Sequence, residues 1–139
     1  MAYSIYALLS KDSPEITISS LLEDLRLFFS KTDEGVFIFE LEEDPFDESE
    51  KNILVTWDDK WWIRFFYDDG SDVAQDSIEI SKMLNGNPPL SIERIDRRIS
   101  VLFGDDESRS YTNHVIFTID FLQEIPGVFL FDLRKKCIL

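Results

Sequence analysis

The sequence predicts a single α+β domain over residues 1–139, built on a mainly antiparallel or mixed β-sheet with helices packed mainly on one face. The length of 139 residues, the 44% hydrophobic content and the low number of Gly and Pro residues suit one globular domain. Alternating apolar residues predict strands, and apolar residues three or four positions apart predict helices. The expected order is β-α-β-β-β-α-β-α-β, in which strands are grouped rather than strictly alternating with helices.

The first part of the chain predicts a strand, a helix and a second strand. Residues 3–9 form the first strand, and Ser20 with Glu23 predicts a capping box that opens a helix ending near Lys31. Residues 36–41 form the next strand, with Phe37 and Phe39 on one face. The following stretch, ELEEDPFDESE at 40–50, has seven carboxylates, Pro45 and no periodicity. We expect it to be an acidic loop.

Residues 52–67 predict a hairpin with a tight turn at Asp58-Asp59. In its second strand Trp61, Ile63, Phe65 and Tyr67 share one face, and Trp62, Arg64 and Phe66 share the other. Two interpretations stay open. The strand is either covered on both faces, or Trp62 and Phe66 are partly exposed beside Arg64.

The second half predicts a helix, a strand, a helix and a last strand. The helix covers about 72–84 and ends at Asn85-Gly86 before Pro88-Pro89. Residues 94–103 form a strand with Ile95, Arg97, Ile99, Val101 and Phe103 on one face. A helix capped by Thr112 or Asn113 runs to about Glu124, and its apolar surface predicts that it is well buried. Residues 128–133 form the last strand.

The charge of the chain restricts its partners. Asp and Glu number 28 against 14 Lys and Arg, a formal net charge of −14. Such a chain repels nucleic acid and anionic membranes and attracts cations or a protein with a basic face. No apolar run approaches the ~20 residues of a membrane span, the first residues do not resemble a signal peptide, and Cys137 is the only cysteine. We expect a cytoplasmic protein.

The residues of catalytic and metal sites are poorly represented. The acidic stretches lack the spacing of a calcium loop, and one His and one Cys cannot build a zinc site. His114 is more typical of a cap or surface position than of a general base, and Cys137 has no adjacent base. No phosphate-binding loop, dinucleotide fingerprint or nucleophile elbow is present. We therefore expect no enzyme activity, no cofactor and no metal.

Acidic residues gather at 40–50, at Asp58-Asp59, at Asp68-Asp69-Asp72 and at 105–107. Any one of these stretches could serve solubility alone. Together they impose a self-repulsion that solubility does not require, and they would speed encounter with a basic partner. Aromatic side chains surrounded by charged residues, as in WDDKWWIRFFYDDG, are typical of binding hot spots.

Two stretches, ELEEDPFDESE and WDDKWWIRFFYDD, combine acidic turns with nearby aromatic residues. In this combination, and in its acidity and small size, the chain resembles bacterial immunity proteins encoded beside contact-dependent or other polymorphic toxins. The resemblance implies a protein that binds one cognate toxin, often a basic nuclease, and blocks its active site or substrate groove.

The candidate partner-binding residues come from three of the acidic stretches and the aromatic strand. They are Glu42, Glu43, Asp44, Phe46, Asp47, Glu48, Asp58, Asp59, Trp62, Asp68 and Asp69. Two alternatives remain. A DNA mimic or regulatory module needs its carboxylates along one extended face rather than at both ends of the sheet, and an enzyme of another type needs His114 in a cleft beside a carboxylate or Tyr111.

Overall fold

A computed structural model describes residues 3–31, 37–44, 46–57, 61–84, 92–106 and 109–139, and for residues 44 and 47–50 it describes the backbone only. The elements in chain order are β1 (Tyr3–Leu9), α1 (Ile18–Phe29), β2 (Phe37–Asp44), β3 (Asp47–Trp57), β4 (Trp61–Asp69), α2 (Ser71–Met83), the 3₁₀ turn η1 (Ile92–Arg94), β5 (Arg97–Phe103), α3 (Thr112–Gln123), β6 (Val128–Asp132) and β7 (Cys137–Ile138).

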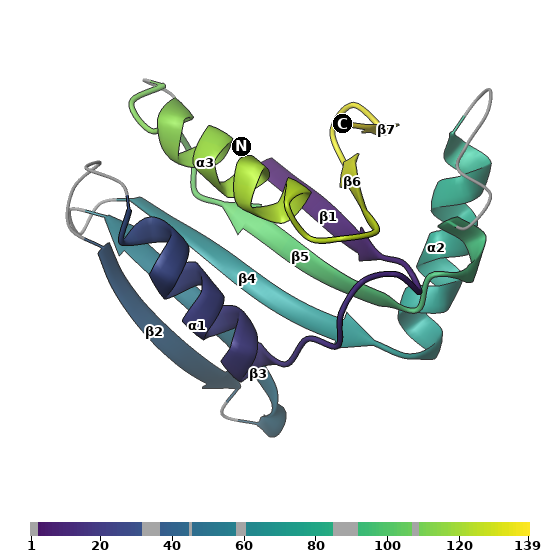
Figure 1. The fold of residues 1–139 in the computed structure, drawn as a ribbon, viewed down its shortest axis with the longest axis horizontal. Coiled ribbons are helices and arrows are strands. Elements are labelled where there is room, and N and C mark those ends of the chain that lie inside the picture. The colour runs from purple at the N-terminus through teal and green to yellow at the C-terminus, as the bar shows by residue number, and fades with distance from the viewer. Residues whose placement is uncertain (1–2, 32–36, 45, 58–60, 85–91, 107–108) are drawn as a thin grey trace.

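The strands form one antiparallel sheet in the order β2-β3-β4-β5-β1-β6-β7 (Figure 1). The predicted α+β class and the predicted order of elements are confirmed, with the two-residue β7 added at the end. β1 lies between β5 and β6, so the chain ends are tied into the sheet by pairings distant in sequence.

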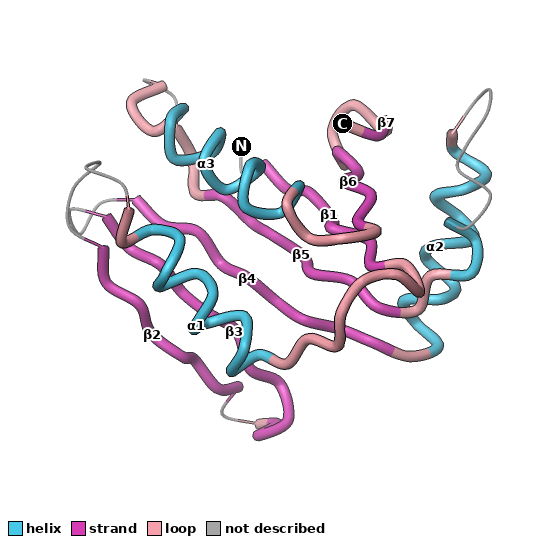
Figure 2. Tube along the Cα trace, in the orientation of Figure 1, coloured by secondary structure: helices cyan, strands magenta, loops and turns pink. Residues whose placement is uncertain are grey.

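The helices are divided unequally between the faces of the sheet. Ile5, Ala7 and Leu9 of β1 join the larger core, which α1 and α3 cover, whereas Leu8 joins a smaller core with Ile80 of α2. Alternate residues of a strand point to opposite faces, so α2 lies on the face opposite α1 and α3. Figure 2 shows α1 and α3 side by side across the sheet, with α2 beyond the end of β4 and β5.

The larger core contains a group of aromatic rings between β3, β4 and α3. Trp57 and Trp61 are buried, and the ring of Tyr111 stacks on Trp61 with centroids 4.8 Å apart. His114 is also buried, with its ring centroid 4.9 Å from that of Trp57. The expectation that His114 is a cap or surface residue is wrong, because the first turn of α3 faces the core.

Two helix starts differ from the prediction. α1 begins one turn earlier than expected: the Thr17 hydroxyl accepts a hydrogen bond from the Ser20 N–H, and Ser20 Oγ accepts one from the Thr17 N–H. Ser20 is therefore the third helical residue rather than the cap. α3 begins after Tyr111, which makes no side-chain cap, so the predicted caps Thr112 and Asn113 are wrong. Ile116 is half exposed, so α3 buries one side only.

The strand predicted over 94–103 begins later, at Arg97, because residues 92–94 form a 3₁₀ turn. Ile99, Val101 and Phe103 share the larger core as predicted, but Ile95 belongs to the smaller core with Ile92. The Arg97 guanidinium donates hydrogen bonds to the carbonyls of Ser10, Ser13 and Pro14, which holds the segment between β1 and α1. The predicted helix stop at Asn85-Gly86 and Pro88-Pro89 lies outside the described residues.

Candidate functional site

The acidic segment 40–50 is not the predicted loop. β2 runs through Asp44, and β3 begins at Asp47, so most of the segment is the outer part of a hairpin. Glu43 pairs with Lys51 across the strands, with Nζ and Oε1 3.7 Å apart, and the register shifts between Glu43 and Asp44. Backbone pairing and this ion pair hold the two strands together without apolar alternation in the segment, so the sequence pattern that marks a strand is missing.

One face of β2, β3, β4 and the end of β5 lies on the side of the sheet opposite α1 and α3. No helix of the described chain covers it, and none of the residues that point from this face is buried. We call it the open face: Ile38, Glu40, Glu42, Asn52, Leu54, Thr56, Trp62, Arg64, Phe66, Ser100 and Leu102. Trp62 and Phe66 are partly exposed there, whereas Trp61, Ile63 and Phe65 are buried on the other face. The second interpretation of this strand is the one that the structure shows.

Arg64 connects two of the predicted site residues on the open face. Its guanidinium carbon lies 4.8 Å from the centroid of the Trp62 ring, and its Nε donates to Glu42 Oε1 at 3.1 Å. The cation is thereby shared between a ring face and a carboxylate. Arg64 was not among the candidates, although its place two residues after Trp62 in a strand put it on the same face.

Gly104 supports Trp62 from the adjoining strand end. The Gly104 N–H donates to the Trp62 carbonyl at 2.9 Å, and its carbonyl accepts from Trp61 Nε1 at 3.0 Å. A Cβ at this position would lie 3.1 Å from Trp62 Nε1. The two tryptophans are therefore fixed on opposite sides of one glycine, one in the core and one at the surface.

The other predicted residues of the hairpin have different surroundings. Phe46 is 97% exposed at the turn. Glu43 is exposed at the sheet edge, next to Glu42 but on the opposite face. The side chains of Asp44, Asp47 and Glu48 are not described, and Asp58 and Asp59 lie outside the described residues.

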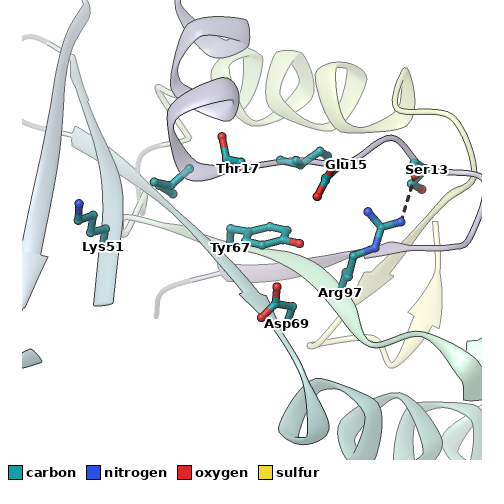
Figure 3. Close-up of a pocket in the computed structure, with 9 residues that line it drawn as sticks. Ser13, Glu15, Thr17, Lys51, Tyr67, Asp69 and Arg97 are labelled. Carbon is teal, nitrogen blue, oxygen red and sulfur yellow. Dashed lines mark hydrogen bonds between the residues drawn. The ribbon is translucent and has the colours of Figure 1, made fainter. Parts of the chain in front are cut away.

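Asp68 and Asp69 are neighbours in sequence that the strand separates. Asp68 pairs in register with Arg98 on the side of Trp62, whereas Asp69 lies on the side of α1. There Asp69 lines a pocket of about 680 Å³ with Ser13, Glu15, Ile16, Thr17, Ile18, Lys51, Tyr67 and Arg97 (Figure 3). Burial raises the pKa of Tyr67, and the nearby Asp69 adds to the effect. Asp69 therefore does not share a surface with Trp62.

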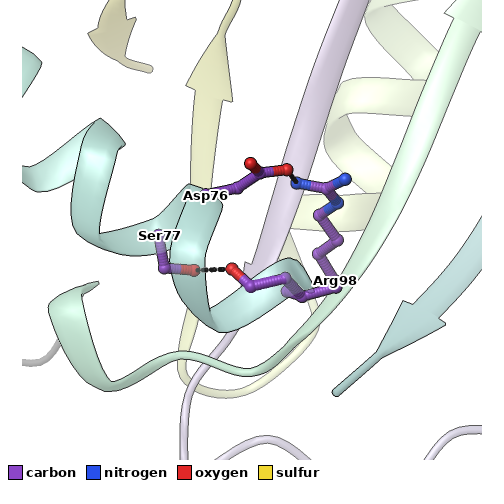
Figure 4. Close-up of polar contacts among 4 residues, drawn as sticks. Asp76, Ser77 and Arg98 are labelled. Carbon is purple, nitrogen blue, oxygen red and sulfur yellow. Dashed lines mark hydrogen bonds and ion pairs between the residues drawn. The ribbon is translucent and has the colours of Figure 1, made fainter. Parts of the chain in front are cut away.

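The basic side chains of the sheet are engaged with the protein itself. Arg98 donates from Nη1 to Asp76 Oδ2 at 2.8 Å, which joins β5 to α2 (Figure 4). Its guanidinium carbon also lies 4.2 Å from the Tyr6 ring centroid. With Arg64 on Glu42 and Arg97 on backbone carbonyls, these arginines consolidate the fold.

The acidic clusters lie at both ends of the sheet. The β2–β3 hairpin and Asp68-Asp69 lie at one end, and Asp105 and Asp106 follow β5 at the other. Asp106 accepts hydrogen bonds from the N–H groups of Ser110 and Tyr111, so it is a turn residue. The described carboxylates thus do not form one extended row.

The described residues contain no group of three or more His, Cys, Asp or Glu side chains that could hold a metal ion. None of the described helices has the length and apolar character needed to cross a bilayer.

Comparison with known proteins adds no relative: no family model matches the chain, and neither a curated protein nor a solved structure matches it.

Proposed function

We propose that this chain is a cytoplasmic inhibitor that binds a basic protein, and that the partner is a cognate toxin domain such as a nuclease. The observation that supports it best is the open face. Trp62 and Phe66 are partly exposed there, and Glu40 and Glu42 lie on the same face, two strands away.

The aromatic rings and the charged side chains would contribute to binding in different ways. Rigid aromatic rings supply contact area that loses water on binding, and this area gives interfaces their hot spots. Carboxylates around them pair with the Lys and Arg residues that a nuclease would use on phosphate, and they speed the encounter. Glu40 forms no ion pair within the described part of the chain, so its charge is available to a partner.

Features of the structure disfavour the alternatives. A DNA mimic requires carboxylates along one face, and here the described acidic clusters lie at opposite ends of the sheet. An enzyme that uses His114 requires that side chain in a cleft, and His114 is packed among the rings of Trp57, Trp61 and Tyr111.

The test is protection from a toxin domain, which the proposal expects to be encoded beside the gene for this chain. Co-expression should restore growth of cells that make the toxin, and the purified pair should form a complex. The double variant Glu40→Gln, Glu42→Gln should protect poorly. The matched control Glu23→Gln, Glu79→Gln removes the same charge from exposed helix positions and should protect fully. Equal protection by the two double variants would show that the carboxylates of the open face do not bind the toxin, and lack of any protection by the wild-type chain would contradict the function.

A further inference from the structure

We propose that the partner supplies an extended segment with basic residues at alternate positions, which pairs with the outer edge of β2 and adds an eighth strand to the sheet. This inference rests on the proposed function and specifies how the partner is bound.

β2 is the first strand of the sheet, so one side of it has no neighbour among the described strands. The backbone groups on that side follow from the hydrogen-bond pattern. The Gly104 N–H donates to the Trp62 carbonyl and the Gly70 N–H donates to the Asp96 carbonyl, both at 2.9 Å. In antiparallel pairs, hydrogen-bonded residues alternate with unbonded ones. The even-numbered residues of β4 therefore bond to β5, and its odd-numbered residues bond to β3.

The same alternation carries through the next two pairings. Leu54 lies opposite Arg64 in a pair that is not hydrogen-bonded, so Leu54 directs its N–H and carbonyl toward Glu40 of β2. The odd-numbered residues of β2 then direct theirs outward: Phe37, Phe39, Leu41 and Glu43. These four residues present a row of donors and acceptors that another strand can pair with.

β2 has only part of the protection that is usual for an edge strand. Natural edges are blunted by short length, by charged side chains (Lys above all), by Pro or by β-bulges. β2 has acidic side chains and a register shift between Glu43 and Asp44, but it is eight residues long, where β7 at the opposite edge has two, and it contains neither Lys nor Pro. Its side chains on both faces are accessible: Ile38 is 45% exposed and Leu41 is 42% exposed.

The charge of β2 indicates which kind of strand can pair with its outer edge. Four of its eight residues are acidic: Glu40, Glu42, Glu43 and Asp44. In an antiparallel pair of two copies, the outward groups can bond only where odd-numbered residues of β2 face one another. The registers of greatest overlap that meet this condition set Glu40 opposite Glu40 or Glu42 of the other copy, and like charges opposite one another destabilise a pair. A second copy of this chain is thus disfavoured, and a strand that carries Lys or Arg is favoured.

The faces of β2 specify the pattern of that strand. Glu40 and Glu42 point to the open face, so an added strand should place its basic residues there. Phe39 and Leu41 point to the side of α1, where Phe39 contacts Phe29, so the intervening residues of the added strand should be apolar. The segment alternates basic and apolar residues.

The experiment uses the whole chain and a capped ten-residue peptide of alternating Lys and Val as the probe. Amide hydrogen exchange at Phe39 and Leu41 should slow by about 10-fold or more when the peptide is added, whereas amides that already bond to β3, such as Glu40, should change little. A peptide of the same composition with its lysines and valines in two blocks, and one N-methylated at alternate residues, should give no such protection. Peptide binding without protection of Phe39 and Leu41 would overturn the inference.

A pair of variants tests the same edge with the toxin domain. Leu41→Pro removes one outward N–H, and Leu41→Thr shortens the same side chain but keeps the N–H. Leu41→Pro should weaken binding at least 10-fold more than Leu41→Thr, with both folded by circular dichroism. Should Leu41→Pro unfold, the exchange experiment decides alone. Equal, undiminished binding by both folded variants would refute edge pairing and leave the proposed function standing, whereas a wild-type chain that binds no toxin would refute both.

Discussion

The guanidinium of Arg64 lies over the Trp62 ring, 4.8 Å from its centroid, while its Nε is bonded to Glu42. Ring and carboxylate thereby hold the only basic side chain that the described part of the open face contains. The ring is fixed in orientation before a partner arrives, which lowers the entropy lost on binding. The open face keeps a negative charge because Glu42 balances Arg64 and Glu40 has no such partner among the described residues.

Replacement of Trp62 and of Trp61 should separate binding from folding. Trp62→Ala should weaken binding to the toxin domain by about 2 kcal/mol or more, because it removes a partly exposed ring at the centre of the proposed interface. Trp61→Ala should lower the free energy of unfolding by about 3–5 kcal/mol, because Trp61 is 2% exposed and its Nε1 is bonded to Gly104. Calorimetric titration and urea denaturation measure the two quantities. Unchanged affinity in a folded Trp62→Ala protein would show that this ring is not an anchor.

Salt should slow association with the toxin domain. The formal net charge of −14 predicts a steered encounter, and ions at 0.5 M screen charges beyond a few ångströms. We expect the association rate constant to fall about 10-fold or more between 0.02 and 0.5 M salt, with a much smaller change in the dissociation rate constant. Stopped-flow fluorescence of the tryptophans provides the measurement. An association rate that does not depend on salt would exclude the steering role.

Much of the fold could be predicted because its signals are local. The alternation in β4 assigned Trp61, Ile63 and Phe65 to the core and Trp62, Arg64 and Phe66 to the other face, and the structure agrees. Helix ends were harder to predict. Ser20 has the residue types of a cap around it, yet the cap is Thr17, because the Thr17 hydroxyl accepts a hydrogen bond from the Ser20 N–H and the added turn packs Ile18 against the larger core.

The site was predicted only in part because its arrangement depends on pairing between strands. The acidic segment lacks apolar alternation, so its strands are not visible in sequence; their pairing comes from β3 and from contacts such as Glu43 with Lys51. Asp68 and Asp69 seemed one cluster in sequence, but a strand directs neighbours to opposite faces. The link from Trp62 through Arg64 to Glu42 joins residues 20 positions apart, and only the register of the sheet brings them together.

Asp132 should make the protein sensitive to acid. Burial by itself would raise the pKa of Asp132, but hydrogen bonds from the N–H groups of Lys135 and Arg134 and from the Tyr3 hydroxyl together outweigh it and lower the pKa below 3.8. As the pH falls below about 4, the carboxylate of Asp132 takes up a proton in the unfolded chain before it does so in the folded protein. The stabilisation is therefore complete above about pH 4 and is lost as the pH falls through the lowered pKa.

The variant Asp132→Asn should be less stable than the wild type by about 1–2 kcal/mol at pH 7, because a neutral amide accepts the same N–H groups more weakly. The difference should shrink between pH 4 and pH 2. Urea denaturation across this range measures it, and Tyr3→Phe, which removes one of the three hydrogen bonds, should show a smaller loss. A difference between Asp132→Asn and wild type that stays constant down to pH 2 would contradict the lowered pKa.

Arg97 should matter for stability and not for binding. Its Nη2 donates to the carbonyls of Ser10 and Ser13 at 2.7 and 3.1 Å, and its Nη1 donates to that of Pro14 at 2.9 Å. A lysine ammonium cannot reproduce this planar fork, so Arg97→Lys should lower the free energy of unfolding by about 1–3 kcal/mol, whereas Arg94→Lys at an exposed position should change it by less than about 0.5 kcal/mol. Both variants should bind the toxin domain like the wild type, because Arg97 lies on the side of the sheet opposite Trp62. Loss of affinity in a folded Arg97→Lys protein would instead place the interface on the side of the sheet that α1 covers.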